Sequence, residues 1–375
     1  MSVIGSTALQ FSEEQGMILD TAREFCRDKS PISSVRAQLD SDSGFDQSVW
    51  NEMVALGWTG ISLPEAYGGS GLGIAAVVPV VECMGRAILG TPLISSALAG
   101  QLLMRSGDSA QLDRWLPAIA EGTVATFAQL ENGDWGDTQL RCTLDENLVL
   151  HGIKKFVPDA GVADLIVVSV THNNAPALVV VRKDQLADGA VSANTLIDET
   201  KRAASVNFTG IQVDAGDVIG GSKVPVALRD IALLGALLVA AEASGTTGAC
   251  LDTVVEYLKT RKQFGNLFGS YQALKHPMVE ILNANDAARS FIYHGATLVT
   301  DETLDRDAEL ACRMAKAQAT ETLKFAGDRA VQFHGGMGFT YECDAQLYIR
   351  RAQWSQQQFG DAQHHRKRIA ALLFD

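Results

Sequence analysis

The sequence predicts an α+β protein of three consecutive domains: an N-terminal α-helical domain, a middle antiparallel β-barrel or sandwich, and a C-terminal four-helix bundle. Apolar residues recur at helical spacing in 1–122 and again in 228–375, whereas in 123–227 they alternate or form short runs. With 375 residues, of which 47% are hydrophobic, the chain can bury the large core that this architecture requires.

The N-terminal domain is predicted to be a series of helices. The first, at 11–28, begins with Ser12 as its N-cap and has acidic residues in its first turn. A second spans 47–58 and is followed by a Pro- and Gly-rich loop at 61–73. Further helices are predicted at 74–89, 96–107 and 109–122.

The middle domain is predicted to contain short strands joined by polar turns. These strands lie at 123–130, 139–144, 148–152, 165–170, 177–182, 205–210 and 211–215. Because no helical segment separates them, we expect them to pair in an antiparallel sheet or barrel.

The C-terminal domain begins with a long apolar segment, 228–264, which predicts one major helix with a bend near Gly245. Segments 270–299 and 306–334 are predicted to be the second and third helices, and the C-terminal segment the fourth. Together they predict a four-helix bundle.

The composition excludes several classes of function. A net charge of −13 leaves no dominant basic face for nucleic acid. The first residues lack a signal-peptide pattern, and no uncharged apolar run reaches the roughly 18–20 residues that span a bilayer. Six scattered cysteines without a CxxC pair predict reduced thiols and no metal site. We therefore expect a cytoplasmic protein that binds neither nucleic acid nor membrane.

The strongest local pattern lies at 257–276. It places Arg261, Gln263 and Phe264 at a helix end, and Gln272 at the start of the next helix. A guanidinium can donate two hydrogen bonds to a phosphate, a glutamine can donate another, and a phenylalanine can cover a flat ring. The alternative is an ordinary corner between two helices with a solvated arginine.

A second pattern is the glycine-rich segment 332–342. Its glycines allow a ligand to approach the backbone closely, where exposed N–H groups can bind phosphate. It lacks the spacing of a P-loop and follows no predicted strand, which argues against the common nucleotide-binding folds. By itself it could simply separate two helices.

Together the two patterns resemble the acyl-CoA dehydrogenase family, which has an R-x-Q-F-G segment and a Q-x-x-G-G-x-G segment at similar positions. The resemblance extends over essentially the whole chain, because 56–73, 88–96 and 151–168 also resemble segments of that family. It implies the three-domain fold predicted above, with FAD wedged between domains and completed by a neighbouring subunit.

The resemblance also implies two groups of FAD contacts. Arg261, Gln263 and Phe264 would reach the FAD of an adjacent chain, and Gln332, Gly335 and Gly336 would lie along its pyrophosphate and adenosine. The full set of cofactor positions that it implies is Arg261, Gln263, Phe264, Gln272, Gln332, Gly335, Gly336, Phe127, Gln129, Leu130 and Phe156.

The implied reaction is α,β-dehydrogenation of an acyl-CoA thioester, in which a carboxylate takes the α proton and the flavin accepts hydride from the β carbon. Electrons would pass to an electron-transferring flavoprotein or a similar acceptor. No metal is implied.

The sequence departs from the family where the catalytic base is expected. Phe359 stands at the Glu of the family's Y-E-G-T segment, and Gly235 at the helical position that other members use. Glu242, two helical turns after Gly235, is the leading alternative base, and Asp361 is the reserve. Glu242 could instead be satisfied by an arginine or a backbone group at a helix interface.

The predicted flavin contacts depart from the family as well, because Leu130 and Pro158 replace threonines and proline has no N–H to donate.

The ending F-G-D-x-x-x-H-R, at 359–366, is similar to that of a bacterial branch of the family. In that branch unequal subunits form α2β2 assemblies that act on bulky acyl-CoAs, including steroid side chains. Two functions follow: a dehydrogenase in a homo- or heterotetramer, or a non-catalytic subunit that completes a partner's FAD site. A flavin oxidase of the same fold is a third.

Overall fold

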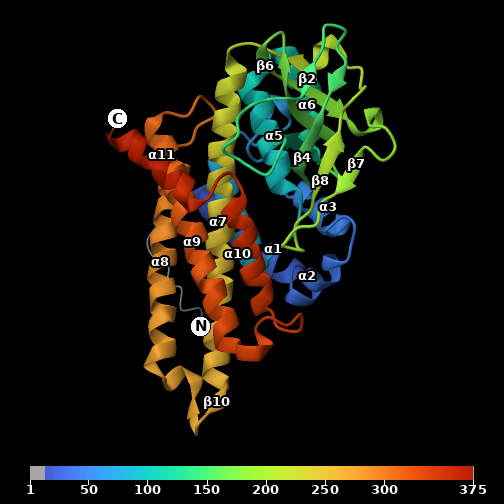
Figure 1. Cartoon of the computed structure of the whole chain (residues 1–375). Helices are drawn as coiled ribbons and strands as arrows, with labels where there is room; N and C mark the ends of the chain where they lie inside the picture. Colours follow the sequence, from blue (N-terminus) through green and yellow to red (C-terminus); the bar gives the residue numbers. More distant parts are fainter. Residues whose placement is uncertain (1–12, 375) are drawn as a thin grey trace.

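The computed structural model describes residues 13–374 and has the predicted order of three domains (Figure 1). The predicted N-cap Ser12 lies outside the described residues. Six α-helices form the N-terminal domain: α1 (Glu13–Lys29), α2 (Ile32–Leu39), α3 (Gln47–Ala55), α4 (Val77–Ala87), α5 (Leu93–Ser106) and α6 (Ser109–Ala120). Helix α6 starts with a capping box, in which Asp108 and Gln111 bind each other's backbone N–H groups.

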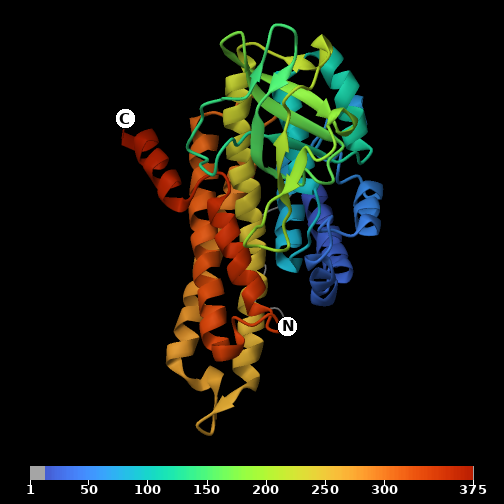
Figure 2. The ribbon, with the colours of Figure 1, turned by 45° about the vertical axis from the view of Figure 1, so that its right-hand side comes forward.

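The middle domain consists of two sheets. The larger has the strand order β3-β2-β5-β6-β9 with β1 also paired to β5, and the smaller has the order β4-β8-β7. The larger sheet contains β1 (Ala125–Ala128), β2 (Thr143–Leu144), β3 (Leu150–His151), β5 (Leu165–His172), β6 (Ala175–Arg182) and β9 (Val218–Ile219). The smaller contains β4 (Ile153–Pro158), β7 (Val191–Ala193) and β8 (Ala203–Asn207). Figure 2 shows these strands in front of α5 and α6.

The antiparallel pairing that we expected holds for most of these strand pairs, but β5 pairs in parallel with both β1 and β2. The predicted strand at 139–144 is reduced to its last two residues, since the Glu131 carboxylate binds the backbone N–H groups of Arg141 and Cys142. Residues 211–215 form only a single bridge, between Gln212 and Val149.

Helix α7 (Lys223–Thr260) runs the length of the molecule and continues unbroken through Gly245. A Cβ on Gly245 would lie 1.9 Å from the carbonyl oxygen of Glu82, so this glycine permits close packing against α4. Helix α7 is apolar and long enough to cross a membrane, but most of its apolar stretch is buried inside the molecule. Its composition is therefore explained by its central place in the core.

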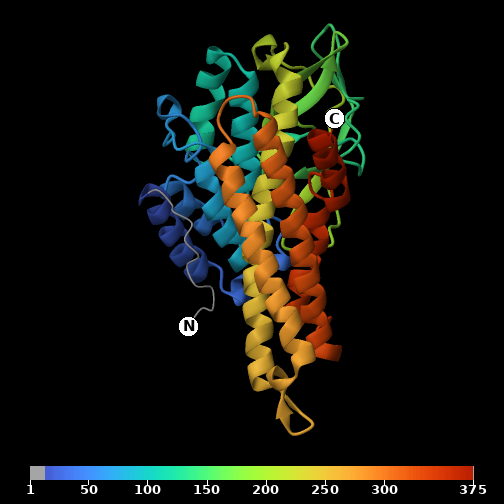
Figure 3. The same cartoon turned by 90° about the vertical axis from the view of Figure 1, so that its left-hand side faces the viewer.

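The bundle is completed by α8 (Gln272–Leu298), α9 (Arg306–His334) and α10 (Ala345–Gln357), as Figure 3 shows. The predicted fourth helix is in fact two, α10 and α11 (Ala362–Phe374). They are separated where Phe359 and Gly360 adopt φ angles of 55° and 95°, which an α-helix does not allow. A short hairpin, β10 (Lys262–Gln263) and β11 (Asn266–Leu267), connects α7 to α8.

Candidate functional site

The two positions at which the resemblance would place a catalytic base, 359 and 235, lie in contact. The Phe359 ring covers Gly235 so closely that a Cβ on this glycine would lie 2.3 Å from the ring. The same ring packs against Phe127 and Trp135, with centroid distances of 6.2 and 4.4 Å. The structure therefore brings together the two alternative base positions that the resemblance implies, and the Phe359 ring covers both.

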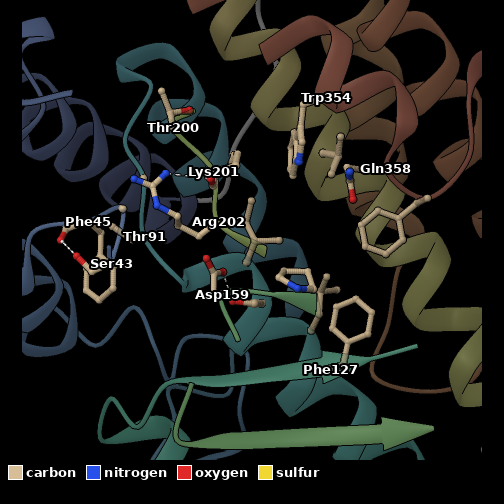
Figure 4. Close-up of a pocket in the computed structure, with 18 residues that line it drawn as sticks. Ser43, Phe45, Thr91, Phe127, Asp159, Thr200, Lys201, Arg202, Trp354 and Gln358 are labelled. Atoms are coloured by element: carbon tan, nitrogen blue, oxygen red, sulfur yellow. Dashed lines mark hydrogen bonds between the residues drawn. The ribbon is translucent and has the colours of Figure 1, made fainter. Parts of the chain in front are cut away.

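Phe359 also separates two cavities. The inner cavity, of about 60 Å³, lies between α5, the end of β4 and α10, and it is lined by Ser95, Asp159, Lys201 and Trp354 among others (Figure 4). The outer cavity, of about 570 Å³, lies between the β domain, the start of α7 and α11. Phe359 lines both cavities, so its ring stands as a wall between them.

Glu242, the leading base candidate, is fully buried in an ion-pair network. Its Oε1 lies 2.5 Å from Lys201 Nζ and 3.1 Å from an Arg351 guanidinium nitrogen, and Arg351 in turn pairs with the buried Asp198. This matches the interpretation of Glu242 as a carboxylate satisfied at an interface. Its Oε2 has no hydrogen-bond partner among the described residues, and Glu242 lines neither cavity.

Asp361, the reserve candidate, is exposed and caps α11, where its Oδ1 accepts a 2.7 Å hydrogen bond from the backbone N–H of His364. Next to this turn, the buried Lys316 donates to the carbonyl of Gly360 at 2.8 Å. Burial lowers the pKa of Lys316 to about 7, with Asp361 opposing the shift. These contacts fix the turn that presents Phe359.

The sequence prediction missed Asp159, a carboxylate that lines the inner cavity. Its Oδ2 accepts a 2.6 Å hydrogen bond from Ser95 Oγ, and burial raises the pKa of its carboxyl to about 6. Asp159 has a φ of 53° in the turn that follows β4. An Asp within the largely apolar segment 156–168, which also contains Asp164, was the available signal, but the direction of the Asp159 side chain depends on this turn.

The predicted flavin contacts of the β domain do not line one common pocket. Phe127 and Leu130 are buried, with Phe127 at the inner cavity. Gln129 lines the outer cavity, where its buried Oε1 has no partner among the described residues. Phe156 is 40% exposed and lies at the β-bulge of β4, beside Gly133. The nearby Glu131 is engaged by Lys154 at 2.7 Å.

The remaining cofactor candidates gather at the far end of the bundle. Tyr257 and His334 stack with their ring centroids 4.2 Å apart, which places the ends of α7 and α9 side by side. The predicted residues at these ends are all exposed: Arg261, Gln263, Phe264, Gln272, Gln332, Gly335 and Gly336. No ion pair of Arg261 is found among the described residues.

The far-end group and the β-domain group are too distant to bind one cofactor within this chain. Gly235, beside Phe359, and Arg261, just past the end of α7, are 26 positions apart along the chain, or about 39 Å at 1.5 Å per residue. A ligand pocket of roughly 300–1,000 Å³ is only about 10 Å across. The two groups therefore belong to different binding sites.

A helical domain, a two-sheet β domain and a bundle of long helices define the architecture of an acyl-CoA dehydrogenase. The family models for the N-terminal and C-terminal domains of acyl-CoA dehydrogenase match residues 12–123 and 227–374. The chain belongs to the acyl-CoA dehydrogenase family.

Individual relatives agree with this assignment. The chain is 28% identical to acyl-CoA dehydrogenase IpdE2 of Mycolicibacterium smegmatis, over 97% of this chain and 100% of the relative. Among solved structures, a variant of the Tcur3481–Tcur3483 steroid ACAD is 25% identical, with a TM-score of 0.84 over 96% of this chain and 98% of that one. The ChsE4–ChsE5 complex of Mycobacterium tuberculosis, at 21% identity, shares the fold with a TM-score of 0.85 over 97% and 98%.

Proposed function

We propose that this chain is one subunit of an assembly that carries out FAD-dependent α,β-dehydrogenation of an acyl-CoA thioester, and that it completes the FAD site of a same-fold partner that has the base. The observation that carries the proposal is the contact between Phe359 and Gly235, which fills both base positions with groups that cannot take a proton.

The inner cavity of this chain's own flavin half does not fit the cofactor. The inner cavity, at about 60 Å³, is far below the roughly 300–1,000 Å³ of typical ligand pockets. Pro158 has no N–H to offer, and its carbonyl already accepts a 2.6 Å hydrogen bond from Thr126. We therefore derive no redox step within this chain.

The far end of the bundle fits a phosphate-bearing cofactor held by a neighbour. Arg261 and Gln263 offer exposed side-chain donors on the hairpin between α7 and α8. Gly335 and Gly336 have open space where a Cβ would stand, so a ligand can approach their backbone. When bound there, FAD would supply the redox chemistry, while these residues would orient it and neutralise its pyrophosphate.

The same-fold partner would be a homologous chain in an α2β2 tetramer. Support for two unequal chains comes from the Tcur3481–Tcur3483 steroid ACAD and from the ChsE4–ChsE5 complex. The first of these, described as a steroid ACAD, also favours a bulky acyl group such as a steroid side chain. An electron-transferring flavoprotein is the proposed acceptor, because this chain is 26% identical, over 91% of its length, to subunit CarC of the caffeyl-CoA reductase–Etf complex of Acetobacterium woodii.

A second candidate function is a self-sufficient dehydrogenase with Glu242, or else Asp361, as base. The observation in its favour is the unpartnered Oε2 of Glu242, a buried carboxylate oxygen. On this hypothesis, Glu242→Gln would abolish flavin reduction by acyl-CoA and leave FAD bound. Turnover retained by Glu242→Gln but lost in Asp361→Asn would move the base to Asp361.

The test of the proposed function is co-purification with a same-fold chain that has Glu at the position of Phe359 or Gly235. We expect this chain alone to lack flavin and the pair to contain it, as measured by flavin absorbance. Flavin bound equally well by this chain alone would contradict the proposal.

A further inference from the structure

A third cavity, of about 640 Å³, lies outside the candidate site, where α1 and α4 pack against α7 and α8. Gly248 of α7 lines it, whereas Val239 of α7 lines the inner cavity. Nine residues at 100° each place these two positions on opposite sides of the helix. The cavity is therefore separate from the acyl and flavin region, and it has the size of a ligand pocket.

The inner wall of this cavity is apolar. Leu19, Cys26 and Cys83 are each at least 94% buried and line it together with Ala87 of α4. Burial raises the pKa of the Cys83 thiol to about 12, so this wall is uncharged at neutral pH. Such a wall favours a hydrocarbon body over water.

The rim of the cavity is basic. Four arginines line it, Arg23, Arg27, Arg86 and Arg289, against a single lining carboxylate, Glu82. Glu82 is already engaged, because its two oxygens accept hydrogen bonds from Arg289 at 2.6 Å and from Tyr293 at 2.5 Å. Arg86 is engaged as well, because it pairs with Asp252 of α7.

Two of these arginines are available for a ligand. The side chains of Arg23 and Arg27 are 54% and 70% exposed, and among the residues that the structure describes they pair only with Asp20 and Asp28 on the same helix. Exposed pairs of this kind contribute little, so an incoming anion can replace them. Each guanidinium also has five donors, of which these pairs use few.

We propose that this arginine-rimmed cavity binds an amphipathic anion, with its hydrocarbon body against Leu19, Cys26 and Cys83 and its carboxylate or phosphate head at Arg23 and Arg27. The apolar wall supplies affinity through burial, and the guanidiniums orient the head group. The site takes a ligand that is distinct from FAD and from the acyl group under dehydrogenation.

The test is calorimetric titration of the full chain with sodium dodecanoate and with dodecyl phosphate, which distinguish a carboxylate from a phosphate head. Dodecanol, which lacks the charged head group, and inorganic phosphate, which lacks the hydrocarbon chain, are the comparators. We expect saturable binding of at least one of the two amphipathic anions, and we expect added salt to weaken it. Each comparator should bind about tenfold more weakly or worse, which corresponds to a loss of about 1.4 kcal/mol of binding free energy.

The double variant Arg23→Gln/Arg27→Gln should weaken this binding by about tenfold, while Arg141→Gln, a comparably exposed arginine on the β domain, should leave it unchanged. Ala87→Phe, which fills the cavity, should abolish it, with thermal unfolding as the check that each variant is folded. Absence of saturable binding, equal binding of dodecanol, or binding unaffected by the double variant would overturn the proposal. None of these readouts depends on flavin or on a partner subunit.

Discussion

At residue 359 the backbone and the side chain act together. A positive φ at Phe359 turns the chain between α10 and α11 and aims the ring at Gly235, where no Cβ can be accommodated. The ring lines both the inner and the outer cavity. Position 235 must therefore remain small for as long as position 359 is aromatic.

This coupling predicts the outcome of a double-mutant cycle. Gly235→Ala should destabilise the chain by about 1–3 kcal/mol through overpacking against Phe359. Phe359→Ala should cost about 3–5 kcal/mol because it leaves a void. In the double variant the alanine at 235 has room, so the loss of unfolding free energy that Gly235→Ala causes should nearly vanish. If the losses caused by the two substitutions add up in urea unfolding, the two residues are independent.

The ion pairs of Glu242 predict a structural effect of its removal. Glu242→Gln removes the counter-charge of Lys201 and one of the two carboxylates that pair with the fully buried Arg351, which should reduce the free energy of unfolding by about 3 kcal/mol. Under the proposed function, an assembly that contains this variant keeps its acyl-CoA dehydrogenation at temperatures where it is folded. Selective loss of flavin reduction with unchanged stability would instead identify Glu242 as the base.

Lys316 predicts a pH dependence of stability. Its pKa is about 7 in the folded chain and near 10.5 when unfolded, so between these values the unfolded state binds more protons and stability rises with pH. Relative to Lys316→Met, the wild type should gain stability from pH 7 to pH 10 and show no gain below pH 6. A constant difference in urea unfolding between the two proteins across this range would show that Lys316 is not buried as a neutral amine.

At the scale of elements, the hairpin between α7 and α8 is the part that we propose acts on another chain. Arg261→Ala should weaken FAD binding by a co-assembled partner by about ten- to hundredfold, because a charge-assisted hydrogen bond is worth about 1.5–3 kcal/mol. Lys259→Ala, an exposed cation on the last turn of α7, is the matched control and should have no effect. Equal flavin content in both variants, with the tetramer intact, would exclude Arg261 from the FAD site.

Elements in which apolar residues recur at a regular spacing were predictable from the sequence, whereas pairings between strands far apart in the sequence were not. The apolar pattern of 228–264 identified α7, although the helix begins at Lys223 and ends at Thr260. The parallel pairing of β1 with β5 was missed because it joins residues about 40 positions apart, and no local pattern records that contact. The break at Phe359 was missed because a positive φ at a bulky residue is rare.

The sequence identified which residue types stand at the base positions of the site. The roles of Glu242 and Asp159, however, depend on contacts with residues that are distant in the sequence. The ion pairs of Glu242 come from Lys201 in the β domain and Arg351 in α10, each more than 40 residues away. Asp159 was missed for the same reason, since its partner Ser95 lies on α5. Charge compensation of this kind becomes visible only in the folded chain.

At the scale of the whole molecule, the chain has two dissimilar ends. The end near the β domain has aromatic and proline residues where a flavin and a base would be needed. The other end has exposed donors and open glycines that no described residue covers. This asymmetry is what a subunit needs if it completes a neighbour's cofactor site and does not build its own.

The most direct test of this account is the flavin content of the chain purified alone and with a base-bearing same-fold partner, followed by titration with acyl-CoA thioesters. The account predicts a colourless chain when alone, and with the partner a yellow assembly that has one FAD for each base-bearing chain and bleaches with an acyl-CoA. A yellow homotetramer of this chain alone, bleached by any acyl-CoA, would contradict it.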